Sequence, residues 1–442
     1  MLRIQLEQAL VLQECAGKRE QETCAAGLVF PSGTRAGEQV FTVRGLREVP
    51  EHAYLKRTGT AACLRPEFCT ELANQARAAS AGVFIAHTHV GRNPLEGFSW
   101  IDDQGEVALA EYFDGRLGTG INFAAVFTAE NVHVRSLGVG GVHETVLVGR
   151  NLVPSLVPSG HALQTHDRQI RAFGQAGQEF LAKLRVAVVG LGGTGSVVAQ
   201  QLAHLGVCSF FFVDPDVVEV TNLNRLVGAT PDVVGQPKVV VASKQVTAIN
   251  PAVECVQLQG DIVDDDVVQA LLNVDFVFCC TDSMASRAVL NQLAYQHLIP
   301  CIDMGVGIGA EEGRIKYISG RVQMLSAGLP CLVCTDKLDA EQVRREMLIE
   351  NQREADPYIQ GAVVAQPAVI SLNSTISSAA VTMFLAAVTG IPSAARMLTY
   401  DGMLGTLRAV AMDPRLHCIA CSENGALARG ASWSLPTRRR GV

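Results

Sequence analysis

One short segment constrains the fold more than any other: an apolar run, Arg185–Val189, followed at once by the glycine-rich turn GLGGTG at 190–195. A helical pattern at 196–205 and a second apolar run, Ser209–Val213, come next. Strand, turn, helix and strand make one βαβ unit. Further apolar pieces of strand and helix length lie at 270–281 and 289–302. This part of the chain is therefore predicted to be α/β, with a mostly parallel, doubly wound sheet.

The texture of residues 1–150 differs. A helix-like beginning is followed by strand candidates at 26–31 and 39–44, a helical stretch at 66–79 and an apolar run at 82–86. The segment 107–113 and a strand-like run at 123–127 come after these. Such runs of strands with a few helices indicate a separate α+β domain. Residues 151–164 hold two prolines, two serines and a glycine, as a linker does. We therefore expect domains at 1–150 and 165–428, and a disordered tail at 429–442.

Composition excludes several classes of protein. Hydrophobic residues make up 48% and charged residues 18% of 442 residues, which is enough to build buried cores. The net charge of -7 gives no reason to expect a nucleic acid or an anionic membrane as partner. The first residues lack the apolar core of a signal peptide, and the apolar stretch at 362–391 is interrupted by polar residues, as in a buried helix. Thirteen cysteines, four of them in two C-x-x-C pairs, suit a reducing cytoplasm.

The glycine turn alone is compatible with two kinds of ligand. A bare backbone at a helix N-terminus can approach the phosphates of a dinucleotide or of ATP. The polar residues that follow favour ATP, because adenylation needs cations for the phosphates, a carboxylate for Mg²⁺ and a clamp on the ribose. These residues are Asp214, Asp216, Asn222, Arg225, Lys238 and Asp282. Hydride transfer by a nicotinamide enzyme would leave the cations without a purpose.

These motifs resemble the ThiF/MoeB family, the Rossmann-like adenylating core shared with ubiquitin-activating enzymes. The resemblance extends over HDRQIRAFGQAGQEFL, RVAVVGLGGTG, VDPDVVEVTNLNR, GQPKV and CTDSMASR. It implies that Asp214 binds the ribose, that Asp282 holds Mg²⁺, and that Arg168 reaches the phosphates from the other subunit of a homodimer, with Arg171 as the alternative. The expected phosphate-binding residues are Gly190, Gly192, Gly193, Gly195, Asp216, Asn222, Arg225 and Lys238.

Two C-x-x-C pairs predict a second kind of site. Four thiolates from two tight turns can enclose a tetrahedral Zn²⁺ with no open position, which is a structural role. The ligands would be Cys331, Cys334, Cys418 and Cys421. Relatives that form a thioester have a further cysteine after the first pair, and this sequence has none between Cys334 and Cys418. Either the acyl-adenylate is handed on directly, or another residue accepts the acyl group.

A histidine pair in the first domain predicts a catalytic metal site. His87 and His89 leave an apolar run, and Ser99 and Asp102 follow. Two imidazoles and a carboxylate can hold Zn²⁺ with one position open for water. The pattern resembles the JAMM/JAB metalloprotease signature, which implies Glu22 as general base and Ser99 as a catalytic residue. The spacer from His89 to Ser99 has nine residues instead of the usual seven, and Val90 replaces the usual proline. A degenerate domain that only binds the partner is the alternative.

The leading hypothesis joins both domains in one enzyme. It would adenylate the C-terminal glycine of a ubiquitin-like protein and process or deconjugate that protein, in a bacterial-type conjugation pathway that includes a conjugating enzyme. The first alternative is an activating enzyme for a sulfur-carrier protein of thiamin, molybdopterin or cysteine biosynthesis. The others are a non-catalytic scaffold for a ubiquitin-like protein and, last, a nicotinamide-dependent oxidoreductase.

Overall fold

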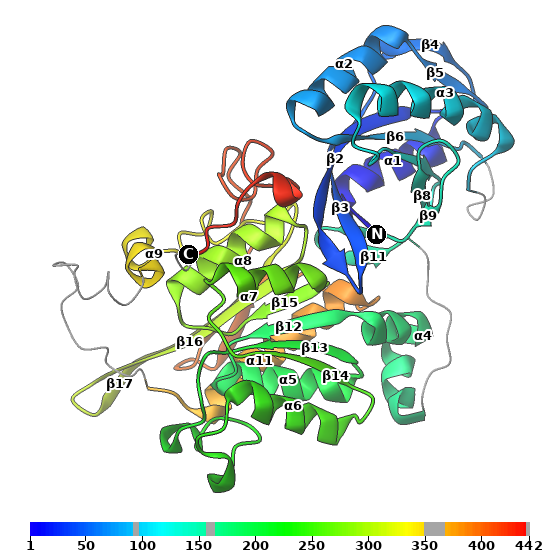
Figure 1. Cartoon of the computed structure of the whole chain (residues 1–442). Helices are drawn as coiled ribbons and strands as arrows, with labels where there is room; N and C mark the ends of the chain where they lie inside the picture. Colours follow the sequence, from blue (N-terminus) through cyan, green and yellow to red (C-terminus); the bar gives the residue numbers. More distant parts are fainter. Residues whose placement is uncertain (92–96, 156–163, 349–366, 439–442) are drawn as a thin grey trace. The chain divides into compact units, whose positions relative to one another are not determined.

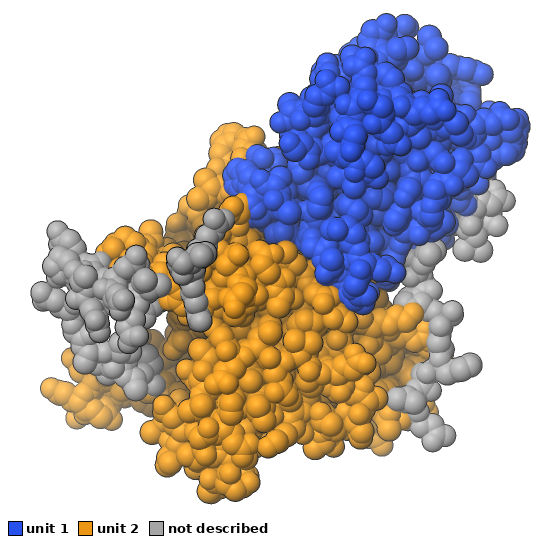
Figure 2. Space-filling model, in the orientation of Figure 1, with its two compact units in different colours: residues 1–157, 296–298, 426–433 blue, residues 158–295, 299–425, 434–442 orange. Residues whose placement is uncertain are grey.

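The computed structural model of the chain describes residues 1–91, 97–155, 164–348 and 367–438. Figure 2 shows its two compact units. Unit 1 consists of Met1–Val157, Gln296–Leu298 and Ala426–Trp433, and unit 2 of Pro158–Tyr295, Ile299–Gly425 and Ser434–Val442. Most of the expected linker at 151–164 lies outside the described residues, so the domain boundary stays a prediction.

Unit 1 is built on a mixed β-sheet. Its described strands form one nine-stranded sheet in the order β11-β10-β1-β3-β2-β6-β7-β8-β9, and β4 and β5 form a separate pair (Figure 1). The strands are β1 (Leu2–Gln5), β2 (Cys24–Arg35), β3 (Glu38–Glu48), β4 (Tyr54–Arg57), β5 (Ala62–Leu64), β6 (Gly82–Thr88), β7 (Phe123–Phe127), β8 (Val132–Ser136), β9 (Val142–His143), β10 (Thr145–Val148) and β11 (Leu152–Pro154).

Helices cover both faces of this sheet. They are α1 (Leu6–Lys18), α2 (Pro66–Ala78) and α3 (Trp100–Leu117). Along β6, Phe84 and Ala86 belong to the cluster that contains α1, whereas Val83 and Ile85 belong to the one that contains α2 and α3. Successive side chains of a strand point to opposite faces, so this unbroken apolar run indicates a strand buried on both sides.

The beginning of the chain differs from the sequence prediction. A helix was expected there, but Leu2–Gln5 is a strand that runs parallel to β10 and β3, and α1 starts only at Leu6. The spacing of apolar residues did not reveal this strand, because its partner strands lie about 40 and 140 positions further along the chain. All four of its residues are also buried, so it lacks the alternation of buried and exposed residues that indicates a strand. The segment 107–113 lies within α3.

Unit 2 contains the parallel sheet. The order of its described strands is β14-β13-β12-β15-β16-β17-β18-β19, with the first five parallel to one another and the rest antiparallel. This arrangement is a mixed α/β fold, and its strand order reverses between β12 and β15, where ligands of such sheets bind. The strands are β12 (Arg185–Val189), β13 (Ser209–Val213), β14 (Glu254–Leu258), β15 (Phe276–Cys279), β16 (Cys301–Glu311), β17 (Arg314–Leu325), β18 (Met397–Asp401) and β19 (Thr406–Ala409).

The helices of unit 2 lie on both faces of its sheet. Figure 1 shows α5 and α6 on one side and α8 on the other. The α-helices are α4 (Asp167–Lys183), α5 (Gly193–Leu205), α6 (Lys238–Ile249), α7 (Asp265–Ala270), α8 (Met284–Gln296), α9 (Ala340–Met347) and α11 (Ile370–Val388). The 3-10 helices of the chain are η1 (Glu51–Ala53), η2 (Gln164–His166), η3 (Val220–Asn222), η4 (Pro231–Val233), η5 (Leu271–Asn273) and η6 (Gly430–Ser432).

Helix α11 corresponds to the apolar stretch predicted at 362–391, of which 362–366 lie outside the described residues. Among those described, it is the one helix long and apolar enough to cross a membrane, and half of its apolar window is buried within the protein. It packs against α5, β16 and β17. These contacts are those of a core helix.

The end of the described chain makes defined contacts. In unit 1, Thr42 Oγ1 donates a hydrogen bond to Ala428 O at 3.1 Å. In unit 2, Arg438 Nε donates to Asp264 Oδ1 at 2.9 Å. The expected disordered tail at 429–442 is thus held as far as Arg438, and 439–442 lie outside the described residues.

Candidate functional site

Three neighbouring strand ends in unit 2 bring the predicted nucleotide-binding residues together. Val189 at the end of β12 pairs with Val213 of β13 and with Cys279 of β15. The glycine turn follows the first of these residues, Asp214 the second, and Asp282 lies three positions after the third. Because parallel strands end at the same edge of the sheet, the polar residues that leave them share one crevice at the switch point.

Glycine is required at two positions of the turn. Gly190 has φ +86°, and a Cβ there would lie 2.9 Å from Cys280 C in the loop after β15. A Cβ on Gly195 would come within 1.8 Å of Gly190 O. Gly192 is the N-cap of α5, and Gly193 is its first residue. The turn therefore presents bare backbone at a helix N-terminus, an arrangement that favours phosphate.

Asp214 is fixed against this turn. Its carboxylate accepts hydrogen bonds from Leu191 N at 2.6 Å and from Asp216 N at 2.9 Å, and only 4% of the residue is exposed. Burial raises the pKa of this carboxyl, although Lys238 and the two amides oppose the shift. The carboxylate thus has a fixed direction next to the place where phosphate would bind.

Lys238 is the cation beside Asp214, and Arg225 lies beside the glycine turn. Lys238 Nζ lies 2.7 Å from Asp216 Oδ2 and 3.8 Å from Asp214 Oδ1. The side chain of Asn222 is buried and accepts a hydrogen bond from Glu219 N at 3.2 Å. Arg225 Nη1 donates to Thr221 O at 2.7 Å, and Arg225 Cδ lies 3.6 Å from the position of a Cβ on Gly193.

Asp282 and Arg168 occupy different surroundings. Asp282 is exposed, in the loop that contacts Gly190. The next residue, Ser283, donates to Glu346 Oε2 at 2.6 Å, and this oxygen also accepts from Ala285 N at 2.9 Å, so α9 caps the start of α8. Arg168 is exposed on α4, and within the described residues it makes no hydrogen bond or ion pair to the crevice residues.

Sequence reasoning missed one residue of this crevice. Asn373 of α11 is buried, and its Nδ2 lies 2.1 Å from where a Cβ on Gly193 would stand. Four positions later, Ser377 Oγ donates to Thr194 O at 3.0 Å. Two polar residues four apart on an apolar helix share one face, and this pattern was a usable signal.

The four predicted zinc-binding cysteines form one buried cluster. The sulfurs of Cys331 and Cys334 are 3.7 Å apart, and Cys418 and Cys421 lie 3.4 Å from Cys331 and Cys334 respectively. Four sulfurs each about 2.3 Å from Zn²⁺ stand about 3.8 Å apart in a tetrahedron. A hydrogen bond from Cys421 lowers the pKa of Cys331 to about 5. The donor set and spacing thus fit a four-thiolate zinc site.

The predicted His–Asp site of unit 1 also converges. His87 Nε2 lies 3.1 Å from His89 Nε2 and 3.0 Å from Asp102 Oδ1, and His89 Nε2 lies 3.3 Å from Asp102 Oδ2. Nitrogen and oxygen ligands about 2.0–2.1 Å from Zn²⁺ are about 3.3–3.4 Å apart in a tetrahedron. Burial raises the pKa of Asp102, but hydrogen bonds from both imidazoles outweigh it and hold that pKa well below its usual range. These three residues fit a metal site with an open fourth position.

Glu22 lies beside this site because of strand register. Cys24 of β2 pairs with His87 in an antiparallel ladder, and Thr88 N donates to Thr23 O at 3.0 Å. Continuing this register places Glu22 opposite His89, on the same face of the sheet. Glu22 is 3% exposed.

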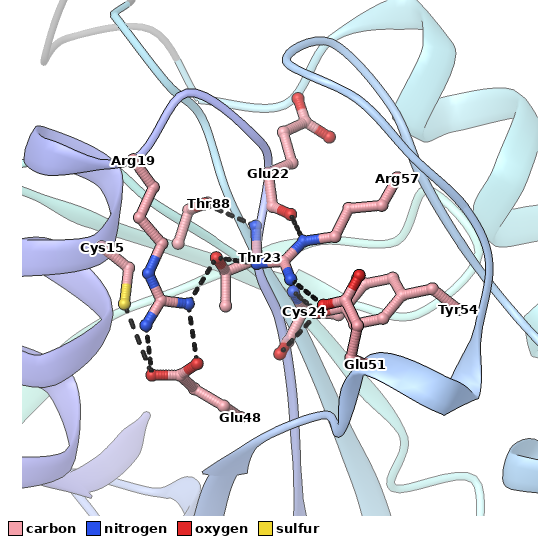
Figure 3. A network of polar contacts seen from close by, with 10 residues as sticks. All are labelled: Cys15, Arg19, Glu22, Thr23, Cys24, Glu48, Glu51, Tyr54, Arg57 and Thr88. Atoms are coloured by element: carbon pink, nitrogen blue, oxygen red, sulfur yellow. Dashed lines mark hydrogen bonds and ion pairs between the residues drawn. The ribbon is translucent and has the colours of Figure 1, made fainter.

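A polar network fixes the chain around Glu22 (Figure 3). Arg57 Nε donates to Glu22 O at 2.8 Å, and Arg57 Nη2 and Arg19 Nη1 donate to Thr23 Oγ1 at 2.8 and 3.2 Å. Arg19 also pairs with Glu48 at 2.8 Å. The carboxylate of Glu22 points away from these arginines in Figure 3.

Ser99 has a structural partner. Its hydroxyl accepts from Asp102 N at 3.5 Å, and Asp102 Oδ2 accepts from Ser99 N at 2.5 Å, so the two residues form the capping box of α3. Asp102 is thus both a helix cap and a candidate metal ligand.

Three further cysteines do not fit a nucleophilic role. Cys279 and Cys301 are buried in β15 and β16. Burial raises the pKa of both thiols, and that of Cys280, well above the usual value. A thiol held protonated is a poor nucleophile, so these three cysteines are poor candidates for accepting an acyl group.

A glycine turn at the switch point of a doubly wound sheet, with a buried carboxylate and a lysine beside it, defines a nucleotide-binding α/β protein. The chain belongs to the ThiF family, whose profile matches residues 166–420. The molybdopterin-synthase adenylyltransferase of Escherichia coli K12 is 29% identical over 267 residues, which are 60% of this chain and 98% of that protein.

Two more comparisons cover smaller parts of the proteins or have lower identity. Ubiquitin-like modifier-activating enzyme 5 of Drosophila willistoni is 32% identical over 180 residues, which are 38% of this chain and 44% of that protein. A crystal structure of E. coli MccB with ATP superposes with a TM-score of 0.46 and 17% identity, over 60% of this chain and 76% of that one.

Proposed function

We propose that this chain uses ATP to adenylate the C-terminal glycine carboxylate of a ubiquitin-like or sulfur-carrier protein. The observation that carries the proposal is Asp214, held against the glycine turn with Lys238 Nζ 3.8 Å away. In this crevice the turn would receive the phosphates of ATP, and the carboxylate would accept hydrogen bonds from the ribose hydroxyls. Membership of the ThiF family and similarity to an adenylyltransferase support the same reaction.

The chemistry requires charge neutralisation more than covalent catalysis. A carboxylate oxygen of the partner attacks the α-phosphorus of ATP, a new P–O bond forms, and the bond to the bridging oxygen breaks, so that pyrophosphate leaves with the electron pair. Lys238, Arg225 and the amides at the start of α5 would stabilise the charge that moves onto phosphate oxygens. Asp282 would hold Mg²⁺, which supplies further neutralisation. Asn222 and Asp216 would orient these groups, and Arg168 would act from a second subunit of a homodimer.

Two classes of partner fit this reaction. One relative is named for molybdopterin synthase and another for activating a ubiquitin-like modifier. We place conjugation of a ubiquitin-like protein first and sulfur transfer second. The missing cysteine between Cys334 and Cys418 supports direct transfer from the adenylate, to a conjugating enzyme or to a sulfur donor.

ATP–pyrophosphate exchange with a Gly-Gly-ended candidate protein tests the adenylation site. Arg225→Ala and Asp282→Ala should each lower the exchange rate about 10²-fold or more, because each removes charge stabilisation of the transition state. Arg314→Ala is the matched control, since Arg314 is exposed on β17 away from the crevice. Exchange that survives both crevice substitutions would reject the site, and no exchange by the wild type with any such partner would favour a scaffold.

We also propose a second activity for unit 1, a JAMM-like zinc peptidase or isopeptidase that acts on the same partner. The three ligand atoms of His87, His89 and Asp102, 3.0–3.3 Å apart, support it, together with Glu22 in register with His89. Zinc would supply Lewis-acid activation of a water molecule. Glu22 would take a proton from that water as its oxygen adds to the carbonyl carbon, and Ser99 would stabilise the oxyanion. The C–N bond then breaks and the amine leaves with the proton.

Cleavage of a fusion joined after the Gly-Gly terminus tests this second activity. We expect cleavage by the full-length chain, its loss with a chelator, and its recovery when Zn²⁺ is added back. Glu22→Gln should lower the rate about 10²- to 10⁴-fold, as expected for loss of a general base. Glu20→Gln is the control two positions away on an exposed residue. Absence of cleavage by the wild type would identify unit 1 as a domain that only binds the partner.

Both activities on one chain would raise the effective concentration of their shared partner. We place this enzyme in the cytoplasm, where thiolates for the Cys331 cluster stay reduced.

A further inference from the structure

Asp102, the third candidate metal ligand of unit 1, lies at the start of a helix and not on the sheet that carries the two histidines. Asp102 is in the first turn of α3, and part of the chain between it and His89, residues 92–96, lies outside the described residues. The two histidines belong to the sheet or leave it directly, since His87 is in β6 and His89 N donates to Phe127 O at 2.9 Å. A ligand on a separate element is correctly placed only if that element is fixed relative to the sheet.

Arg135 of β8 makes this connection. Its Nη1 lies 2.8 Å from Asp103 Oδ1, and its Nη2 and Nε donate to the carboxylate of Glu106 at 2.9 and 3.1 Å. The guanidinium also lies over the ring of Phe98, 3.8 Å from its centroid. The side chains of Arg135 and Glu106 are only 8% and 7% exposed. A buried bidentate pair of this kind has a fixed geometry, unlike a surface ion pair.

The partners of Arg135 lie on both sides of the ligand along the chain. Phe98 precedes the N-cap Ser99, Asp103 directly follows Asp102, and Glu106 is one helical turn further on. On the sheet side, Val126 of β7 pairs both with His133 of β8 and with His87 of β6. One guanidinium therefore ties the first turns of α3 to the same rigid ladder that carries the histidines.

We propose that Arg135 is a positioning residue of the metal centre: through Glu106 and Asp103 it sets the approach of Asp102 to His87 and His89. This inference rests on the proposed metal site of unit 1. Residues that orient metal ligands through hydrogen bonds typically change metal affinity about 10- to 100-fold when they are replaced.

The test measures zinc binding by the full-length protein, with Zn²⁺ alone as the probe. The wild type should bind two ions per chain, one at the four cysteines and one at the His–Asp site, and chelator competition gives the affinity of each. Arg135→Gln should weaken the His–Asp site about 10-fold or more while the cysteine site, an internal reference, stays unchanged. Arg135→Lys should recover part of the loss. Arg116→Gln is the matched control, because Arg116 is exposed on α3 and its guanidinium lies over Tyr112.

Two further measurements test the positioning role of Arg135 even if the first variant does not fold. If Arg135→Gln does not fold, Asp103→Ala removes the contact of a half-exposed carboxylate with Arg135 and should weaken the site about two- to fivefold. Co²⁺ bound at the His–Asp site should change its visible absorption in the Arg135 variants, which a purely structural residue would not cause. Affinities and spectra equal to those of Arg116→Gln would overturn the positioning role alone. A wild-type chain that binds one ion, at the cysteines, would instead overturn the proposed metal centre, and the role of Arg135 with it.

Discussion

The two candidate metal sites of this chain use different numbers of ligands for different purposes. In unit 2, four buried thiols stand 3.4–3.7 Å apart along three of their edges and can enclose an ion completely. In unit 1, two imidazoles and one carboxylate form a triangle, and His87 keeps 19% of its side chain exposed. A closed site stabilises a fold, whereas an open one leaves a position for water and substrate. Coordination number and exposure therefore distinguish the two roles.

Burial acts on a carboxylate in both units, with opposite results. It raises the pKa of Asp214, which has a lysine 3.8 Å away. It also raises that of Asp102, but there two imidazole contacts reverse the shift. The two carboxylates therefore differ in how readily they ionise: Asp102 is held as the anion that a cation requires, whereas Asp214 loses its charge at a higher pH than an ordinary aspartate.

The largest expected effect concerns the closed site. Cys418→Ser should abolish zinc binding in unit 2 and destabilise that unit by several kcal/mol, since structural zinc sites have apparent binding free energies of about 10–16 kcal/mol. Calorimetry with zinc analysis measures both effects. Cys255→Ser, at a half-exposed thiol of β14, is the control and should change stability by about 1 kcal/mol or less. Equal stability of the two variants would contradict a structural zinc.

His87→Ala should have the reverse profile. We expect loss of one zinc ion and a fall of about 10³-fold in cleavage, because metal-assisted water activation is lost. The unfolding free energy should change by only about 1 kcal/mol, because a partly exposed ligand contributes less to packing than a buried one. His52→Ala, at an exposed histidine, serves as control in the same assays. A large drop in melting temperature for His87→Ala would mean that the unit 1 site is structural too.

Chelation should separate the two sites in time. An open site with three protein ligands exchanges its ion more readily than a closed one, so EDTA should remove the zinc of unit 1 first. Cleavage would then stop while ATP–pyrophosphate exchange and the melting of unit 2 persist. Zinc release followed by chromatography, with both activities assayed at each time, measures the order. Simultaneous loss of both ions would contradict the assignment of an open site to unit 1 and a closed site to unit 2.

The smallest expected effect is a pH dependence of ATP binding. Ribose recognition needs the ionised form of Asp214, and burial raises the pKa of that group. Acidification should therefore weaken ATP binding at a higher pH than an ordinary aspartate would allow. Calorimetric titration of ATP measures it. Asp214→Asn should bind more weakly and with no such pH dependence; an identical profile in this variant would assign the titration to another group.

Local patterns predicted unit 2 better than unit 1. The strands at Arg185–Val189 and Ser209–Val213 were found with correct bounds, because a βαβ unit shows its period and its glycine turn within about 30 residues. The strand Leu2–Gln5 was mistaken for helix, because distant partners determine it. The roles of Asn373 and Arg135 were not predicted for the same reason, because their contacts join residues that are far apart in the chain.

The double use of Asp102 links metal occupancy to helix dynamics. The same carboxylate oxygen that lies 3.3 Å from His89 accepts the capping hydrogen bond from Ser99 N. Withdrawal of the cation would remove a contact that holds Asp102 to the histidines of the sheet, and fraying of α3 from its amino end would become easier. Amide exchange in the first turn of α3 would then report the loading of the site, even when no substrate is present. Zinc binding and the order of the first turn of α3 would thus be thermodynamically coupled: bound zinc would stabilise the ordered turn, and an ordered turn would strengthen zinc binding.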